Sequence, residues 1–338
     1  MRRLALVGLL LAACVGPGTV PAAAPDIAKS IRGYLAELDG DDSFSGVVLV
    51  AKDFVPFATK VTGYADRATG APNATITPFN IASLTTLFTA VAIEELVDQG
   101  KVSLADPLSK YLPAYPKPAG DEITVTMLLG HTTGTGDYLS DPGYLEVRDT
   151  FGSLTELAGS VNTAIAPGTV PGKTYRYSTT GYLLLGLVIE KASGRDYYAY
   201  MEDEVFARAG VAAGFLQNTD AERRKRGFAL GYVAHGAKNW SNLPARGTPA
   251  TSAYATAPDL LSFHKALATG TLAKPETLRR LVIGPQAAGL TTGVFGGDEL
   301  GASAVFGMTS TGYTVIVLAN VGGAAAPVAD RILKIVGR

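Results

Sequence analysis

The sequence predicts an α/β fold in which both ends of the chain contribute strands to one antiparallel sheet, with a mostly helical segment between them. Continuous apolar runs, typical of buried strands, occur near both ends of the chain. These runs are 46–51, 302–308 and 313–319. Most of the intervening chain shows helical spacing and loops. We therefore expect an α/β part at about 26–80 and 255–338 and a helical part at about 81–254.

Apolar spacing predicts the individual elements. Residues 26–38 carry apolar side chains at the spacing of one helix face, and the run 46–51 is followed by a partner strand at 57–65. Gly100 closes the long helix expected at 85–98, and Thr256 lies just before the helix expected at 257–268. The remaining expected elements are helices at 85–98, 183–192, 257–268 and 329–336, and a hairpin of 302–308 with 313–319.

Composition excludes several classes of function. The chain has 338 residues, of which 47% are hydrophobic and 17% charged, as expected of a globular protein with a large core. The formal net charge of -1 provides no general attraction for nucleic acid, so we expect no such partner. Cys14 is the only cysteine, and the three histidines lack metal-ligand spacing. We expect no disulfide, no metal and no cofactor.

The N-terminus has the features of an export signal. A basic start precedes an apolar stretch at 4–13 that is too short to span a bilayer. The stretch ends in Leu-Ala-Ala-Cys14, which resembles a lipobox. The resemblance implies that 1–13 is a lipoprotein signal peptide and that the sulfur of Cys14 carries diacylglycerol. A Gly/Pro/Ala-rich tether at 14–25 would then hold the domain, 26–338, at the periplasmic face of a membrane.

A second cleavage site remains an alternative. Small residues at 22–24 fit a signal peptidase, which would release a secreted or soluble periplasmic protein. Pro25 follows directly, and its fixed backbone makes a poor fit for a protease that needs an extended substrate. We therefore expect the lipid-anchored form.

Several segments, in their order and spacing, resemble the serine β-lactamase-related family, which includes class C β-lactamases, D-Ala-D-Ala carboxypeptidases and related esterases. The segments are FSGVVLVAKD (44–53), GYADRATGAP (63–72), IASLTTLFTAVAIEELVDQGKVSLADPLSKYLP (81–113), ITVTMLLGHTTG (123–134), YRYSTTGYLLLGLVIEKASG (175–194), TAPDLLSFHKAL (256–267) and GYTVIVLAN (312–320). The resemblance implies the β-lactamase/transpeptidase-like fold, an antiparallel sheet flanked by helices with a mostly helical subdomain, from about residue 26 to the end.

The resemblance also implies a nucleophile, Ser83, at a helix start. Acyl transfer by serine needs a base beside the hydroxyl, and the family supplies it as a lysine one helical turn later, in a Ser-x-x-Lys motif. Here that position is Thr86, whose hydroxyl cannot act as a base near neutral pH. Without the family context, Ser83 would be interpreted as a helix cap.

The family's other two motifs are also altered. Tyr177 matches the tyrosine of its Tyr-x-Asn motif, but Thr179 replaces the asparagine. The best match to its Lys-Thr-Gly or His-x-Gly motif places Phe295 at the cationic or polar position and Gly297 at the glycine. In addition, 250–252 reads Ala-Thr-Ser where the family usually has glycines, and the added β-carbons are expected either to narrow the cleft or to change its backbone angles.

These changes concentrate at the positions that carry chemistry, whereas the scaffold segments are intact. We therefore interpret the chain as a cell-envelope homologue with impaired or absent hydrolysis, acting as a binding or regulatory pseudoenzyme. A small-molecule or peptidoglycan-derived ligand and a membrane, through the lipid anchor, are the expected partners. The alternative is a weak or altered serine hydrolase of the esterase, peptidase or β-lactamase type, acylated on Ser83.

Overall fold

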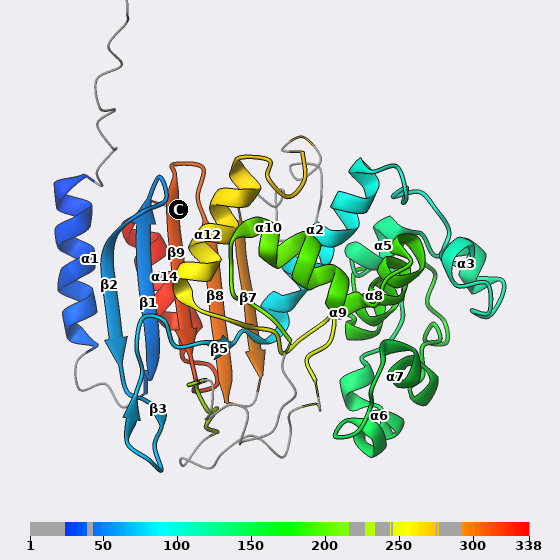
Figure 1. Ribbon diagram of the computed structural model, residues 1–338, viewed down its shortest axis with the longest axis horizontal. Helices are drawn as coiled ribbons and strands as arrows, with labels where there is room; N and C mark the ends of the chain where they lie inside the picture. Colours follow the sequence, from blue (N-terminus) through cyan, green and yellow to red (C-terminus); the bar gives the residue numbers. More distant parts are fainter. Residues whose placement is uncertain are drawn as a thin grey trace, which may run out of the picture.

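Figure 1 shows the protein as a computed structural model. The structure describes residues 24–38, 43–215, 227–233, 244, 246–274, 276, 293–299 and 301–337. The expected signal peptide, Cys14 and most of the expected tether lie outside the described residues, so those expectations remain predictions.

One five-stranded antiparallel sheet, in the order β2-β1-β9-β8-β7, forms the centre of the fold. Its strands are β1 (Gly46–Lys52), β2 (Val55–Thr62), β7 (Gly293–Glu299), β8 (Ala302–Met308) and β9 (Tyr313–Ala319). β1 pairs with β9 along its whole length, so the first strand of the chain lies beside the last, blue beside red in Figure 1. The expected α/β class and the assembly of the sheet from both ends of the chain are confirmed.

Helices cover both faces of the sheet, which explains why β1 is apolar throughout. Val48 and Val50 pack on one face with helices α1 (Pro25–Glu37) and α14 (Ala325–Ile335). Val47 and Leu49 face the other core, where α2 (Thr85–Asp98) and α12 (Ala257–Ala268) pack. Figure 1 shows α14 behind the sheet and α12 in front of it. A strand buried on both sides has no polar face to present, so its sequence is a continuous apolar run.

The helical part is built around α2, which is buried on almost every side and packs against α8 (Thr179–Ser193) and η3 (Met201–Phe206). The remaining helices are η1 (Ala82–Leu84), α2 (Thr85–Asp98), α3 (Leu108–Tyr111), α4 (Ala119–Glu122), α5 (Val125–Leu129), η2 (Tyr138–Ser140), α6 (Pro142–Val147), α7 (Leu154–Ser160), α8 (Thr179–Ser193), α9 (Tyr197–Tyr200), η3 (Met201–Phe206), α10 (Ala207–Ala209) and α12 (Ala257–Ala268). In the part of the chain that the structure describes, no helix is both long and apolar enough to cross a membrane.

Two short sheets join distant segments. β3 (Tyr64–Asp66) pairs with β4 (Ala71–Pro72), and β5 (Phe79–Asn80) pairs with β6 (Tyr254–Ala255). The second pair matters for function, because it holds the residues just before Ser83 against the residues that precede α12.

Some boundaries differ from the expectations. The expected strand at 57–65 is divided between β2 and β3, separated at Gly63, whose φ of 73° lies in the left-handed region that glycine tolerates. The last helix begins at Ala325, four residues before the expected 329. β7 was not expected as a strand, because its two adjacent glycines have low strand propensity; the pairing with β8 compensates for this.

Candidate functional site

Ser83 lies in η1, between β5 and the start of α2, and is partly exposed. The backbone N–H of Ile81 donates to the carbonyl of Ala253 at 2.9 Å, which holds this segment against the residues that precede α12. Ala82 has a φ of 47°, a left-handed conformation that costs a residue with a β-carbon roughly 1–3 kcal/mol. Such local strain directly before a candidate nucleophile is typical of functional sites, where the surrounding structure holds an exposed side chain in place.

Thr86 is one helical turn after Ser83, at the position that the resemblance assigns to a catalytic lysine. Its hydroxyl donates a hydrogen bond to the backbone carbonyl of Ser83 at 2.8 Å, the usual local bond of a helical threonine. The side chain is nearly buried, with 9% of its surface exposed. The hydroxyl proton of Thr86 therefore points at the backbone, and the residue supplies no charge and no base to Ser83.

Tyr177 lies two residues before α8 (Thr179–Ser193), and its ring packs on that of His131. The ring centroids are 4.6 Å apart, and Tyr182 stacks on the same imidazole with a centroid distance of 4.9 Å. His131 is buried, whereas 40% of Tyr177 is exposed. Tyr177, the expected tyrosine of the second motif, therefore packs one side of its ring against His131 and presents its other side to solvent.

His131 is neutral in this environment, because burial lowers its pKa to about 4. Its Nδ1 accepts the backbone N–H of Ser178 at 3.1 Å, a bond that requires Nδ1 to be unprotonated. Sequence reasoning missed His131 because it judged the histidines by metal-ligand spacing alone. The segment HTTG, in which His131 is the first residue, was the available signal.

Thr179, in the place of the motif asparagine, is buried, with 1% of its surface exposed. Its hydroxyl donates a short hydrogen bond to a carboxylate oxygen of Asp137, which the sequence analysis did not single out. Ser178 caps α8 by accepting the N–H of Gly181 at 2.9 Å. Thr179 thus serves the packing of the helix start, and its polar group is already bound within the protein.

Gly297 lies in β7, at the edge of the sheet, where this strand packs against η1. A β-carbon at Gly297 would overlap the backbone nitrogen of Ser83 and would come within 2.7 Å of the nitrogen of Leu84. The close backbone approach explains why glycine occupies this position. Phe295 is in the same strand, opposite Phe306 of β8.

The loop at 250–252 packs inward. Thr251 and Ser252 have 1% and 0% of their surfaces exposed, and Ser252 adopts a φ of 66°. The Thr251 hydroxyl is buried without a hydrogen-bond partner. Ala253 follows, and its N–H donates to the hydroxyl of Thr85 at the start of α2 at 3.0 Å. The loop is therefore held beside the start of α2. The left-handed backbone conformation of Ser252 is one that glycine adopts at lower cost.

The structure thus brings Ser83, Thr86 and Gly297 together. Tyr177 and Thr179 lie at the start of α8, which packs against α2. Chemically, the described part of the site offers a hydroxyl on a strained turn and a backbone N–H beside an edge strand, but its motif threonines add no charge.

A family model described as Beta-lactamase matches residues 31–334 of the chain. The chain belongs to the beta-lactamase family. The match contains every element of the sheet and both motif helices, α2 and α8. This assignment confirms the resemblance recognised in the sequence and the beta-lactamase-like fold.

Penicillin-binding proteins are among the relatives of this family member. The chain is 29% identical over 261 residues to the Bacillus subtilis (strain 168) protein named "Putative penicillin-binding protein PbpX"; the match covers 75% of this chain and 61% of that protein. The crystal structure of a penicillin binding protein from Bacillus halodurans superposes with a TM-score of 0.77 at 28% identity, covering 89% of this chain and 99% of that one.

A D-amino acid amidase from Ochrobactrum anthropi SV3 shares the fold, with a TM-score of 0.74 at 21% identity, over 92% of this chain and 99% of that one. Proteins with different activities therefore share this fold, so the activity of this family member has to be argued from its own site.

Proposed function

We propose that the chain is a cell-envelope pseudoenzyme of the beta-lactamase family, whose cleft binds a small or peptidoglycan-derived ligand and does not turn it over at a useful rate. The observation that carries this proposal is the hydrogen bond from the Thr86 hydroxyl to the carbonyl of Ser83. It places a neutral donor, already committed to the backbone, where serine acyl transfer requires a base.

The second motif supports the same conclusion. Thr179 is buried and bonded to Asp137, so its hydroxyl cannot replace an amide that holds a substrate. Tyr177 has an exposed face, and its stacking on neutral His131 supplies no positive charge that would favour a tyrosinate. A ligand could still contact this exposed ring, which is a feature of binding and not of proton transfer.

The alternative, a weak or altered serine hydrolase acylated on Ser83, is favoured by the backbone alone. The Ser83 N–H lies against β7 at Gly297, and a backbone N–H can stabilise an oxyanion whatever side chains surround it. Losing a positioned general base typically lowers a rate by about 10²–10⁴, which leaves room for slow turnover.

Covalent labelling separates the two functions. The full chain and its Ser83→Ala variant are incubated with a fluorophosphonate or a fluorescent penicillin and analysed by intact mass. We expect no adduct on either protein over a period in which an active family member is labelled completely, and saturable, non-covalent binding of a muropeptide by calorimetry. A mass increase that requires Ser83 would overturn the pseudoenzyme proposal and establish the hydrolase.

A location in the cell envelope belongs to the same proposal. It is supported by the lipobox-like segment ending at Cys14 and by the penicillin-binding proteins among the relatives.

A further inference from the structure

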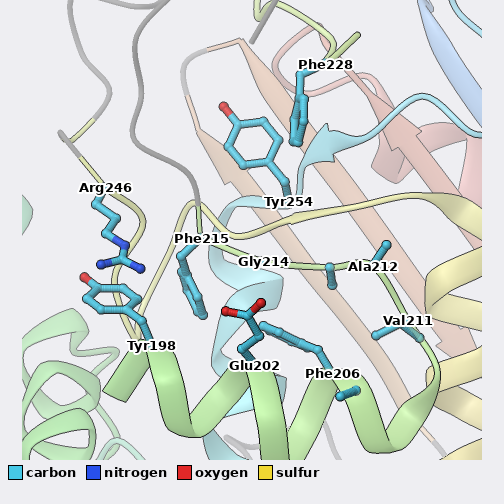
Figure 2. Close-up of a pocket in the computed structure, with 12 residues that line it drawn as sticks. Tyr198, Glu202, Phe206, Val211, Ala212, Gly214, Phe215, Phe228, Arg246 and Tyr254 are labelled. Atoms are coloured by element: carbon cyan, nitrogen blue, oxygen red, sulfur yellow. The ribbon is translucent and has the colours of Figure 1, made fainter. Parts of the chain in front are cut away.

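A cavity of about 400 Å³ lies between η3, α10 and the chain around β6. Figure 2 shows its lining residues, which include several aromatic rings and the charged side chains of Glu202 and Arg246. Its lining includes none of Ser83, Thr86, Tyr177 or Thr179. The volume falls within the range of about 300–1,000 Å³ that is usual for small-molecule sites.

Aromatic rings form most of the apolar wall. Phe228 and Tyr254 meet edge to face, with ring centroids 4.8 Å apart, and Phe215 meets Tyr198 at 5.4 Å. Gly214 adds to the space between them, because a β-carbon at this residue would meet no atom within 4 Å. A planar, apolar ligand body fits such a wall, since aromatic rings pair well in offset or edge-to-face arrangements.

Arg246 supplies a cation at one side of the cavity. Its guanidinium lies over the ring of Tyr198, 3.4 Å from the centroid, and the hydroxyl of that tyrosine donates to the carbonyl of Gly247 at 3.0 Å. The Nε–H of Arg246 is buried without a hydrogen-bond acceptor. Among the described residues, no carboxylate forms an ion pair with Arg246. Buried N–H groups in native proteins are almost always paired, so this donor indicates an acceptor that enters the cavity.

Glu202 lies on a different wall and points into the cavity in Figure 2. Its negative charge disfavours a second anionic group on a bound molecule. The guanidinium fork matches one carboxylate, because its parallel N–H groups meet both oxygens. Together, the aromatic wall, the single unpaired cation and the opposing carboxylate select an apolar body with one negative charge.

We propose that this cavity is a second ligand site, separate from the Ser83 cleft, that binds a small aromatic monocarboxylate with its carboxylate on Arg246. The proposal does not depend on whether Ser83 is catalytic, because the lining of the cavity includes none of the four motif residues named above.

The test is a calorimetric titration of the full chain with three probes: 3-phenylpropionate, its uncharged analogue 3-phenylpropionamide, and succinate. We expect one saturable site for 3-phenylpropionate and affinities at least about tenfold weaker for the other two, because the amide loses the charge-assisted pair and succinate lacks the ring and adds a second charge. Equal affinity of the unmodified chain for the acid and for its amide would overturn the proposal.

Variants locate the site. Arg246→Gln should weaken binding of 3-phenylpropionate at least about tenfold. Arg67→Gln is the matched control, because Arg67 also lies over a tyrosine ring, that of Tyr232 at 4.4 Å, but lines no part of this cavity. Gly214→Leu should abolish binding by filling the space. Unchanged binding in Arg246→Gln or in folded Gly214→Leu would overturn the assignment, as would the absence of saturable binding to the unmodified chain.

Discussion

At the scale of single residues, the proposed loss of hydrolysis depends on a few side chains that substitution can change. The hydroxyls of Thr86 and Thr179 both donate hydrogen bonds within the protein, so each replacement removes an existing hydrogen bond. A lysine at position 86 would bring an ammonium beside Ser83, one turn along the same helix. The site would still lack the asparagine and the third-motif group that hold substrate in the family. Catalytic groups that act together contribute little alone, so the lysine by itself is expected to restore little activity.

The first prediction therefore concerns reversion. We expect the unmodified chain to hydrolyse nitrocefin and short esters at least about 10³ more slowly than an active family member. Thr86→Lys alone should restore little, whereas Thr86→Lys combined with Thr179→Asn and Phe295→His should give measurable turnover, followed by absorbance. Adding Ser83→Ala to this triple variant is the control and should remove the gain. A folded triple variant that is never acylated would mean that the loop at 250–252 closes the cleft or that the motif alignment is wrong.

The second prediction concerns pH. His131 has a pKa of about 4 in the folded chain and about 6.5 when unfolded, so the unfolded chain binds the extra proton between these values. Its contribution to stability is fully present above about pH 6.5 and is lost as the pH falls towards 4. We expect the free energy of unfolding in urea to fall by about 2 kcal/mol between pH 7 and pH 5 through this residue.

His131→Phe is the comparison for that measurement. The variant keeps a ring between Tyr177 and Tyr182 but leaves the Ser178 N–H without its acceptor, so it should be less stable at pH 7 by about 1–3 kcal/mol. Its stability should depend less on pH than that of the unmodified chain over the same interval. Parallel pH curves for the two proteins would show that His131 does not titrate as described.

At the scale of elements, β7 and η1 form the contact that gives the site its shape. A β-carbon at Gly297 would overlap backbone atoms of η1, which cannot move aside as a flexible side chain would. At Gly296, the next residue, the nearest atom would be the carbonyl oxygen of Ala304 at 3.5 Å, an ordinary contact. The two adjacent glycines therefore differ in what they permit.

The third prediction uses this difference. Gly297→Ala should lower the stability of the fold by about 1–3 kcal/mol, because β7 must separate from η1. Gly296→Ala should change stability by less than about 1 kcal/mol, since alanine at an unstrained position also restricts the unfolded chain. Thermal unfolding by circular dichroism measures both. Equal destabilisation of the two variants would contradict the close approach of β7 to Ser83.

The accuracy of sequence-based prediction varied between elements for physical reasons. α2 and α12 were predicted at 85–98 and 257–268, where the structure has them, because each carries a strong local signal. For α2 it is a long apolar run closed by Gly100, and for α12 it is apolar spacing that begins at the Thr256 cap. α8 begins four residues before the expected 183, because its first residues are stabilised by the Ser178 cap and by Asp137, a tertiary contact. The stacking of His131 on Tyr177 likewise joins distant segments, and no local pattern encodes it.

At the scale of the whole molecule, the two edge strands of the sheet, β2 and β7, contact different parts of the protein. α1, the first described helix, contacts β2 at one edge, whereas η1 with Ser83 contacts β7 at the other. With neighbouring strands about 4.8 Å apart, the five-stranded sheet separates these contacts by roughly 20 Å. A chain held through its N-terminus would therefore carry the Ser83 site on the edge of the sheet remote from the attachment.

The last prediction tests that attachment. If Cys14 becomes a lipidated N-terminus, the 11 residues from Cys14 to Ala24 can span at most about 40 Å between the acyl chains and α1. Two acyl chains on one residue are sufficient for stable anchoring. Cys14→Ser should therefore move the protein from the membrane to the soluble fraction, and mass spectrometry of the unmodified protein should find a diacylglycerol-modified Cys14. A variant that remains in the membrane fraction, together with a mature protein that begins near Pro25, would show that cleavage occurs at the alanine site and that a membrane association has another origin.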